Sequence, residues 1–270
     1  MENIYQVDAF TDAAFAGNPA AVCVLSGDKS DQWLQSVAME MNLAETAFVW
    51  PRGRHFHIRW FTPDMEEELC GHATLASSHI LWEQGYVDSG AALEFDSRSG
   101  RLGASRTADG AIELDFPAEP AVPCALPPEL PGILGFSAAS VYFTGRNRLD
   151  YLLEIPDHEV LRRLKPDFAA LREFAAADPF RGVIVTAGGG SSGYDCVSRF
   201  FSTEPTIPED PVTGSAHCCI GPYWKGKSGR HELLAFQASS RGGVLRLGIS
   251  DARVRLGGQA VTVFKGQLLV

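Results

Sequence analysis

The stretch "HATLASSHILWEQG", His72 to Gly85, decides how the chain can fold. Its small and apolar side chains surround the whole helical circumference instead of forming one stripe, which is typical of a helix buried on every side. Gly85 is placed as a C-terminal stop, because glycine adopts the left-handed conformation without a Cβ clash. The sequence therefore predicts a helix that other elements must enclose.

Short segments with alternating apolar and polar side chains supply the enclosing elements. Gly, Asp and Pro residues separate them and favour turns, so each segment is expected to form a strand. The segments are "ETAFVW" (45–50), "FHIRWF" (56–61), "ALEFDS" (92–97), "AIELDF" (111–116), "GVIVTA" (182–187) and "LRLGIS" (245–250). We expect them to form a sheet that curls around the central helix.

A second copy of this arrangement follows later in the chain. Arg59-Trp60-Phe61-Thr62 aligns with Arg199-Phe200-Phe201-Ser202, and an insertion of three residues then brings Gly71-His72-Ala73 onto Gly214-Ser215-Ala216. In both copies a strand leads through an acidic loop to a glycine and an apolar run. The pattern predicts two lobes of related fold. Pro222 is expected to kink or end the second helix, because an interior proline costs a helix about 3 kcal/mol.

The segment "PAEPAVPCALPPELP", Pro117 to Pro131, separates the two lobes. It holds six of the 16 prolines of the chain. Proline fixes φ and lacks a ladder donor, so no regular element can run through this segment. We expect a first lobe over 1–117 and a second over 118–270, with the option that the extreme C-terminal strand returns to the first lobe.

Composition limits the class of ligand. A chain of 270 residues with 45% apolar residues can bury a sizeable core. Its net charge of −10 and pI near 5.2 argue against nucleic-acid and anionic-membrane partners, because both need a basic surface. No apolar run approaches the roughly 20 residues of a membrane span, and no signal peptide is evident, so we expect a cytoplasmic protein with a small ligand. The cysteines form no C-x-x-C pair, which argues against a disulfide framework or zinc site.

The stretch "EDPVTGSAHC", Glu209 to Cys218, places two carboxylates and a proline before the second predicted helix. A helix N-terminus carries unpaired N–H donors and a partial positive charge. Gly214 and Ser215 can therefore serve there as a cap or as a seat for an anion. If the lobes are copies, the two glycine-started helix ends can face each other across one cleft, which is a common place for a ligand.

Several motifs, in the same order along most of the chain, resemble the PhzF-like (phenazine biosynthesis-like) family. The segment 118–180 carries no such match. The motifs are "VDAFTDAAFAGNPAAVCVL" (7–25), "MNLAETAFVW" (41–50), "FTPDMEEELCGHATLAS" (61–77), "SRFFSTEPTIPEDPVTGSAHC" (198–218), "GPYW" (221–224) and "FQASSRGGVLRL" (236–247). The resemblance implies an α+β fold like that of diaminopimelate epimerase, with two pseudo-symmetric lobes, each a curled, mostly antiparallel sheet or barrel around a central helix. It also implies a homodimer, an active site between the lobes, and no organic cofactor or metal.

The resemblance also assigns the site residues. It implies an isomerase that moves a proton between carbons of a small carboxylate-bearing substrate, similar to trans-2,3-dihydro-3-hydroxyanthranilate isomerase. Asn18 and Arg241 stand in turn motifs, and an arginine can pair with a carboxylate in bidentate fashion. The resemblance assigns Glu45, His72, Asp210 and Ser215 as catalytic residues and Gly71 and Gly214 as substrate-binding residues, and we add Asn18 and Arg241 of the turn motifs to the substrate-binding candidates.

Glu45 would act as the proton shuttle. In a closed cleft it would lose hydration, which favours its neutral form and lets it both take and return a proton near neutral pH. His72 would steady that proton or bind the substrate, and Asp210 would accept a proton from a ligand amine or hydroxyl and so orient the ligand. Each residue also has a structural interpretation: Glu45 as an exposed strand-end carboxylate, His72 as a helix cap or a satisfied semi-buried histidine, Ser215 as a helix cap, and Asp210 as a carboxylate at a positive helix end.

Cys70 raises an alternative function. Diaminopimelate epimerase and proline racemase use two facing cysteines, because racemisation needs a proton acceptor on each side of the α-carbon. Cys70 stands where the first thiol would fall, but its counterpart in the second lobe is Thr213. We interpret Cys70 as a small residue in the cleft wall, unless Glu45 supplies the second base. A cofactor-independent amino-acid racemase or epimerase stays open, as does a non-catalytic small-molecule binder on the same fold.

Overall fold

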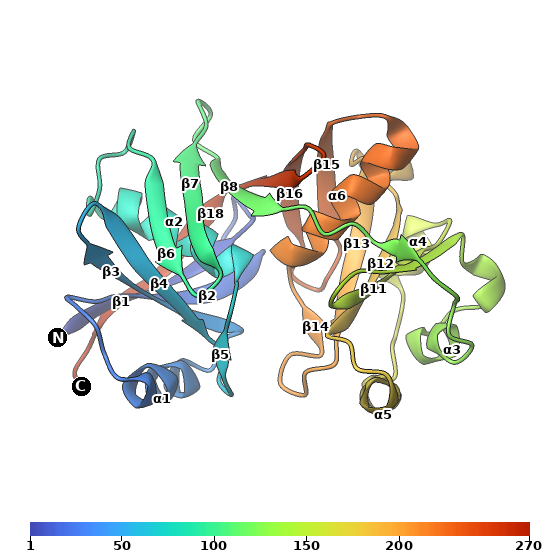
Figure 1. The fold of residues 1–270 in the computed structure, drawn as a ribbon, viewed down its shortest axis with the longest axis horizontal. Helices are drawn as coiled ribbons and strands as arrows, with labels where there is room; N and C mark the ends of the chain where they lie inside the picture. Colours follow the sequence, from blue (N-terminus) through green and yellow to red (C-terminus); the bar gives the residue numbers. More distant parts are fainter. The chain divides into compact units, whose positions relative to one another are not determined.

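The computed structural model describes all residues from 1 to 270. The chain divides into two compact units, Met1–Phe116 with Arg255–Val270, and Pro117–Val254. Each unit combines a curled sheet with a few helices (Figure 1). The α+β fold predicted from the sequence is therefore confirmed.

The sheet of the first unit encloses helix α2 (Gly71–Glu83), which packs against β1, β2, β3 and β18. The strands pair in the spatial order β18–β1–β2–β3–β4–β6–β7–β8, and only β2–β3 and β4–β6 are parallel. Short β5 pairs with β4, and β17 pairs with β8. The bounds are β1 (Glu2–Ala9), β2 (Asn18–Val24), β3 (Glu45–Arg52), β4 (His55–Phe61), β5 (Glu66–Glu67), β6 (Leu93–Ser97), β7 (Gly100–Arg106), β8 (Ile112–Pro117), β17 (Arg253–Gly258) and β18 (Ala260–Leu268).

Helix α2 is buried on every side, as the sequence predicts. Of its 13 residues, 10 are buried. Thr74, Ser77 and Ser78 donate their hydroxyls to the carbonyls four residues earlier, which satisfies the polar groups of a helix that lacks contact with water. The predicted stop, Gly85, has a φ of 72°. The other face of the sheet is covered by α1 (Asp31–Met41), which contacts β3 and β4.

The sheet of the second unit pairs in the order β9–β10–β11–β12–β13–β15–β16, and only β11–β12 and β13–β15 are parallel. Short β14 pairs with β13, and helix α6 packs against β11 and β16. No helix of the chain is long and apolar enough to cross a membrane. The bounds are β9 (Val122–Pro123), α3 (Leu130–Leu134), η1 (Ala138–Ser140), β10 (Phe143–Arg146), β11 (Asp150–Glu154), α4 (His158–Arg162), α5 (Phe168–Ala177), β12 (Gly182–Gly188), η2 (Gly190–Ser192), β13 (Cys196–Ser202), β14 (Glu209–Asp210), α6 (Gly214–Ser228), β15 (Glu232–Gln237) and β16 (Gly243–Ile249).

The two units repeat one pairing scheme. The series β2–β3–β4–β6–β7 and the series β11–β12–β13–β15–β16 both run parallel, antiparallel, parallel, antiparallel. A bidentate ion pair marks equivalent positions. Nε and Nη2 of Arg59 each donate to Glu66 at 2.7 Å, and the same atoms of Arg199 donate to Glu209 at 2.7 and 2.8 Å. The alignment of Arg59 with Arg199 is therefore confirmed.

Helix α6 continues through Pro222 to Ser228, so the expectation that it could end near Pro222 is wrong. Proline lacks the N–H that would bond the carbonyl of Cys218, four residues earlier. The backbone N–H of Glu119 donates to that carbonyl instead, at 3.0 Å. The helix can therefore contain a proline without leaving a buried carbonyl unpaired.

We predict that Pro222→Ala stabilises the protein by less than about 1 kcal/mol, well below the cost of about 3 kcal/mol usual for an interior proline. The reason is that the Cys218 carbonyl already has a partner in Glu119. Urea unfolding of both proteins measures the difference. Gly226→Ala in the exposed last part of the same helix is the control, with an expected gain of about 0.5–1 kcal/mol. A gain near 3 kcal/mol for Pro222→Ala would contradict the explanation.

Candidate active site

Glu45 and His72 form the centre of a polar group in the first unit. Glu45 is the first residue of β3, and His72 is the second residue of α2. His72 Nε2 lies 3.0 Å from Glu45 Oε2, and their side chains are 4% and 18% exposed. Because β2 and β3 run parallel with Ala20 opposite Glu45, Asn18 at the start of β2 reaches the same end of the sheet. Its side-chain amide lies 3.1 Å from His72 Nδ1.

The surroundings of His72 favour its charged form. Burial lowers its pKa, but the contacts with Cys70 and Glu45 outweigh burial and raise the pKa well above the ordinary value. Burial, together with the nearby Glu45, raises the pKa of Cys70 to about 11. The thiol therefore stays protonated near neutral pH, and Glu45 is the contact of His72 that brings a formal negative charge. The result is an imidazolium–carboxylate pair beside a thiol that is not a base.

Glu45, Cys70 and His72 could also be considered as metal ligands, since their ligand atoms lie within 4.8 Å of one another. Glu45 approaches Nε2 of the ring, however, while Cys70 Sγ lies 3.5 Å from Nδ1. Three protein ligands are the minimum of protein zinc sites, and one of the three here is a thiol whose raised pKa disfavours the thiolate form that binds metal. The geometry suits proton transfer better than metal binding.

Asp210 belongs to a second polar group, in the second unit. It lies on β14, and Thr213 Oγ1 donates to its Oδ2 at 2.5 Å. Gln237, at the end of β15, fixes the loop between them: its Oε1 accepts from the backbone N–H of Thr213 at 2.8 Å, and its Nε2 donates to the carbonyl of Asp210 at 2.7 Å. The sequence interpretation missed Thr213 and Gln237 as supports of Asp210. Both lie inside the quoted motifs, but only their contacts reveal the role.

Ser215 is the second residue of α6, and its hydroxyl faces an ion pair of the half-buried Arg181 with the buried Asp150. Arg181 Nη1 donates to Ser215 Oγ at 2.9 Å. Arg181 is itself held by Asp150, with Nε to Oδ1 at 3.0 Å and Nη2 to Oδ2 at 2.5 Å. Because Ser215 accepts from the guanidinium, its own O–H is left to donate elsewhere. The sequence interpretation had no signal for Arg181 and Asp150, which lie far from Ser215 in the chain.

Both central helices begin without a side-chain cap. The N-cap residues are Cys70 for α2 and Thr213 for α6, each with an extended backbone and no capping bond from its side chain. The interpretation of His72, Gly214 and Ser215 as caps is therefore wrong, because all three lie inside their helices. The first N–H groups after Cys70 and Thr213 receive no side-chain acceptor from the cap position, and the helix dipole makes both ends attractive to anions.

Arg241 lies half-buried in the turn between β15 and β16, where the sequence predicts a turn. The same turn is tied to the loop after Asp210, because Ser239 Oγ donates to the carbonyl of Pro211 at 2.8 Å. His217, two residues after Ser215, does not bond to it. Its Nδ1 lies 2.8 Å from the carbonyl of Thr213, and burial lowers its pKa to about 4, so it is a neutral structural residue.

We predict that Glu45→Gln lowers the pKa of His72, because the amide removes the negative charge that stabilises the imidazolium. A pH titration of the histidine resonances by NMR measures the shift, with His217 near 4 as an unchanged internal reference. A histidine whose folded-state pKa lies above the ordinary value near 6.5 stabilises the fold at pH values below 6.5. This stabilisation is lost as the pH rises through the folded-state pKa. The variant should therefore lose most stability at pH 6 and below. An unchanged pKa of His72 would show that Glu45 is not its counter-ion.

Comparison with known proteins identifies relatives along the whole chain. The family model "Phenazine biosynthesis-like protein" matches residues 7–266. A protein named uncharacterized isomerase from Halalkalibacterium halodurans is 50% identical over 268 residues, covering 99% of this chain and 98% of that protein. A crystal structure of a phenazine biosynthesis protein of the PhzF family from Enterococcus faecalis has a TM-score of 0.92 at 39% identity, covering 100% of this chain and 99% of that one.

A more distant neighbour shows the shared fold alone. The structure of a probable proline racemase from Agrobacterium radiobacter superposes with a TM-score of 0.68 at 10% identity, covering 100% of this chain and 93% of that one. Together the family match and the named relatives support an isomerase. The chain belongs to the phenazine biosynthesis-like (PhzF) family.

Proposed function

We propose that this protein is a cofactor-independent isomerase that moves a proton between two carbons of a small carboxylate-bearing substrate. The observation that carries the proposal is the Glu45–His72 pair. The Glu45 side chain is 18% exposed, and the charged partner beside it, His72, has a side chain that is only 4% exposed. A carboxylate in this position can reach a ligand and is steadied by the imidazolium when it is ionised.

The proposed step conserves charge at the substrate carbons. Glu45 removes a proton from one carbon, the electron pair of the broken C–H bond forms a new π bond to the neighbouring carbon, and the π pair of the existing double bond moves to the far carbon. The same proton returns from Glu45 to the far end of that shifted π-system, where a new C–H bond forms. One carboxylate reaches only one face of the substrate, so removal and return occur on the same face. Racemisation needs groups on opposite faces, which is why a single-base site favours a proton shift.

The second polar group would bind and orient the substrate. We propose that the N–H groups at Gly71 and Gly214, each at the start of a helix without a side-chain cap, bind the substrate carboxylate. Asp210, fixed by Thr213 and Gln237, would accept from a substrate amine or hydroxyl, and Ser215 would donate its O–H. Positioning of this kind must supply much of the rate, because general acid–base catalysis alone gives about 10² to 10⁴. A cytoplasmic homodimer is part of the proposal.

We predict that Glu45→Gln abolishes proton transfer, with a loss in kcat of at least about 10³, because the amide cannot take a proton. The assay incubates trans-2,3-dihydro-3-hydroxyanthranilate with the protein in D₂O and follows substrate loss and deuterium incorporation by NMR. Glu40→Gln, at an exposed position of α1, is the matched control and should keep full activity. Retained activity of Glu45→Gln would refute the role of Glu45. Exchange at the α-carbon of an amino acid such as proline would instead indicate a racemase.

We predict that Cys70→Ala keeps kcat within about threefold of the parent value, because a thiol whose pKa is raised to about 11 supplies no base near neutral pH. The same D₂O assay measures the effect, and thermal unfolding checks that the smaller side chain leaves the fold intact. A loss comparable to that of Glu45→Gln in a folded Cys70→Ala variant would favour thiol chemistry and the racemase alternative.

A further inference from the structure

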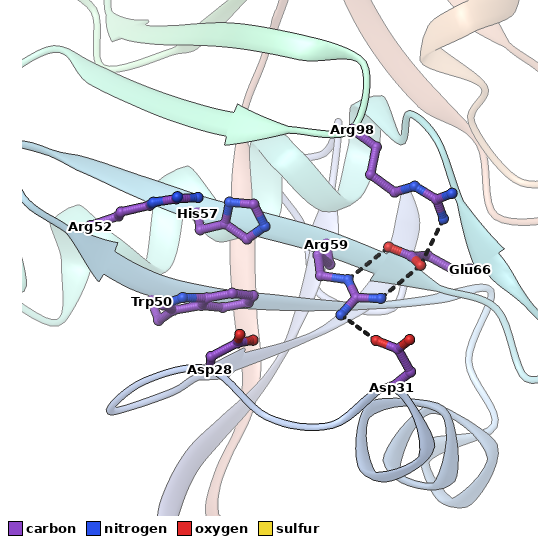
Figure 2. A pocket seen from close by; sticks show the side chains of 8 residues that line it. All are labelled: Asp28, Asp31, Trp50, Arg52, His57, Arg59, Glu66 and Arg98. Atoms are coloured by element: carbon purple, nitrogen blue, oxygen red, sulfur yellow. Dashed lines mark hydrogen bonds and ion pairs between the residues drawn. The ribbon is translucent and has the colours of Figure 1, made fainter.

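A second cavity lies in the first unit, on the face of the sheet opposite α2 (Figure 2). Side chains alternate along β3, so Phe48 and Trp50 pack with Leu34 of α1, whereas Ala47 and Val49 face the central helix. The cavity has a volume of about 590 Å³, and none of its lining residues belongs to the candidate active site. It is lined by Asp28, Asp31, Trp50, Arg52, His57, Arg59, Glu66 and Arg98.

The duplicated fold shows what fills the equivalent place in the second unit. There Arg199, the counterpart of Arg59, donates from Nη1 to the carbonyls of Leu161 and Leu164 at 3.2 and 2.8 Å. Both leucines belong to α4 or the turn after it, and α4 packs on β12 and β13. Their side chains join one buried cluster with Ala187 and Val197. The carbonyl oxygens and the apolar side chains of these two leucines therefore cover this face in the second unit.

The first unit has the same guanidinium, but α1, which lies on the equivalent strands β3 and β4, leaves Trp50 and His57 at the wall of the cavity. Arg59 Nη1 donates to Asp31 Oδ1 at 2.8 Å, and the Asp31 side chain is 84% exposed. Trp50 and His57 are paired across β3 and β4, as Ala187 and Val197 are across β12 and β13. Their ring centroids lie 4.6 Å apart. Figure 2 shows the two rings beside each other, with Arg59 between Glu66 and Asp31.

We propose that this cavity binds a small monocarboxylate that carries a flat apolar ring. The two carboxylate oxygens would replace Asp31 at Arg59 Nη1, in the role that the Leu161 and Leu164 carbonyls have in the second unit. The ring would cover Trp50 and His57, as the leucine side chains cover Ala187 and Val197. A volume of about 590 Å³ accommodates a ligand of this size.

The lining has three arginines and three carboxylates, so its formal charges cancel, and a bound anion needs an arginine that has no partner of its own. Arg52 is exposed and forms no ion pair, so it is available to a carboxylate, whereas Arg98 donates to Glu66 at 2.8 Å. Burial, followed by the charges of Arg52 and Arg59, lowers the pKa of His57, so its ring is a neutral stacking surface. Asp28 remains at the wall and opposes a second negative charge, which favours monocarboxylates over dicarboxylates.

The test uses 2-naphthoate as the probe and the full chain labelled with ¹⁵N. The chain has five tryptophans, so five indole N–H resonances are expected, and Trp50→Phe assigns that of Trp50. We expect 2-naphthoate to shift the Trp50 resonance in a saturable manner. The neutral naphthalene-2-carboxamide should bind at least about tenfold more weakly, because it offers no anion to the arginines.

Variants separate this cavity from the candidate active site. Arg52→Gln should weaken 2-naphthoate binding by about tenfold, whereas Arg54→Gln, an exposed arginine of the same β3–β4 turn outside the cavity, should leave it unchanged. Glu45→Gln should also leave it unchanged, so failure of the proposed isomerase does not decide this test. The proposal is overturned if the Trp50 resonance does not move, or if Arg52→Gln and Arg54→Gln bind the probe equally well.

Discussion

The burial of α2 on every side is the constraint on which the rest of the structure depends. A helix with no water-facing stripe needs a sheet that curls round it, and four strands of the first unit contact it. Its buried hydroxyls must bond within the helix, as those of Thr74, Ser77 and Ser78 do. Its N-terminus then reaches the sheet end where β3 starts, which brings His72 to Glu45. The position of the polar pair follows from the enclosure of the helix.

Divergence of the two units explains why the candidate acid–base pair, Glu45 and His72, occurs in the first unit and has no equivalent in the second. The strand register places Gly182 of β12 at the position that Glu45 has in β3. A Cβ on Gly182 would lie 2.4 Å from Phe200 Cζ, so the second unit has no room for a side chain where the first has its carboxylate. Ser215 stands in place of His72 and accepts from Arg181. One copy thus keeps an acid–base group, and the other keeps hydrogen-bonding groups suited to orienting a ligand.

The sequence predicted the elements and the repeat well, because both depend on local patterns. The helix from His72, the strands and the match of Arg59 with Arg199 are all confirmed. The end of α6 at Pro222 was predicted wrongly, because the rescue of the Cys218 carbonyl by Glu119 is a distant contact that leaves no local pattern. Arg181 and Gln237 were missed for the same reason, since they act through residues remote in the chain. The cavity beside Trp50 depends on how α1 packs on β3 and β4, which only a comparison of the two folded units reveals.

The hydrogen bond from the Glu119 N–H to the Cys218 carbonyl also makes completion of α6 depend on a distant part of the second unit. Glu119 belongs to the proline-rich connector, and Cys218 lies nearly the whole unit further along the chain. The Cys218 carbonyl, in the middle turn of α6, therefore has no backbone N–H partner until the connector packs against the helix. Contacts between residues so distant in sequence form slowly, because the intervening chain loses conformational freedom first. The connector thus completes the hydrogen bonding of a helix that it does not itself contain, and its removal would leave the Cys218 carbonyl without this partner.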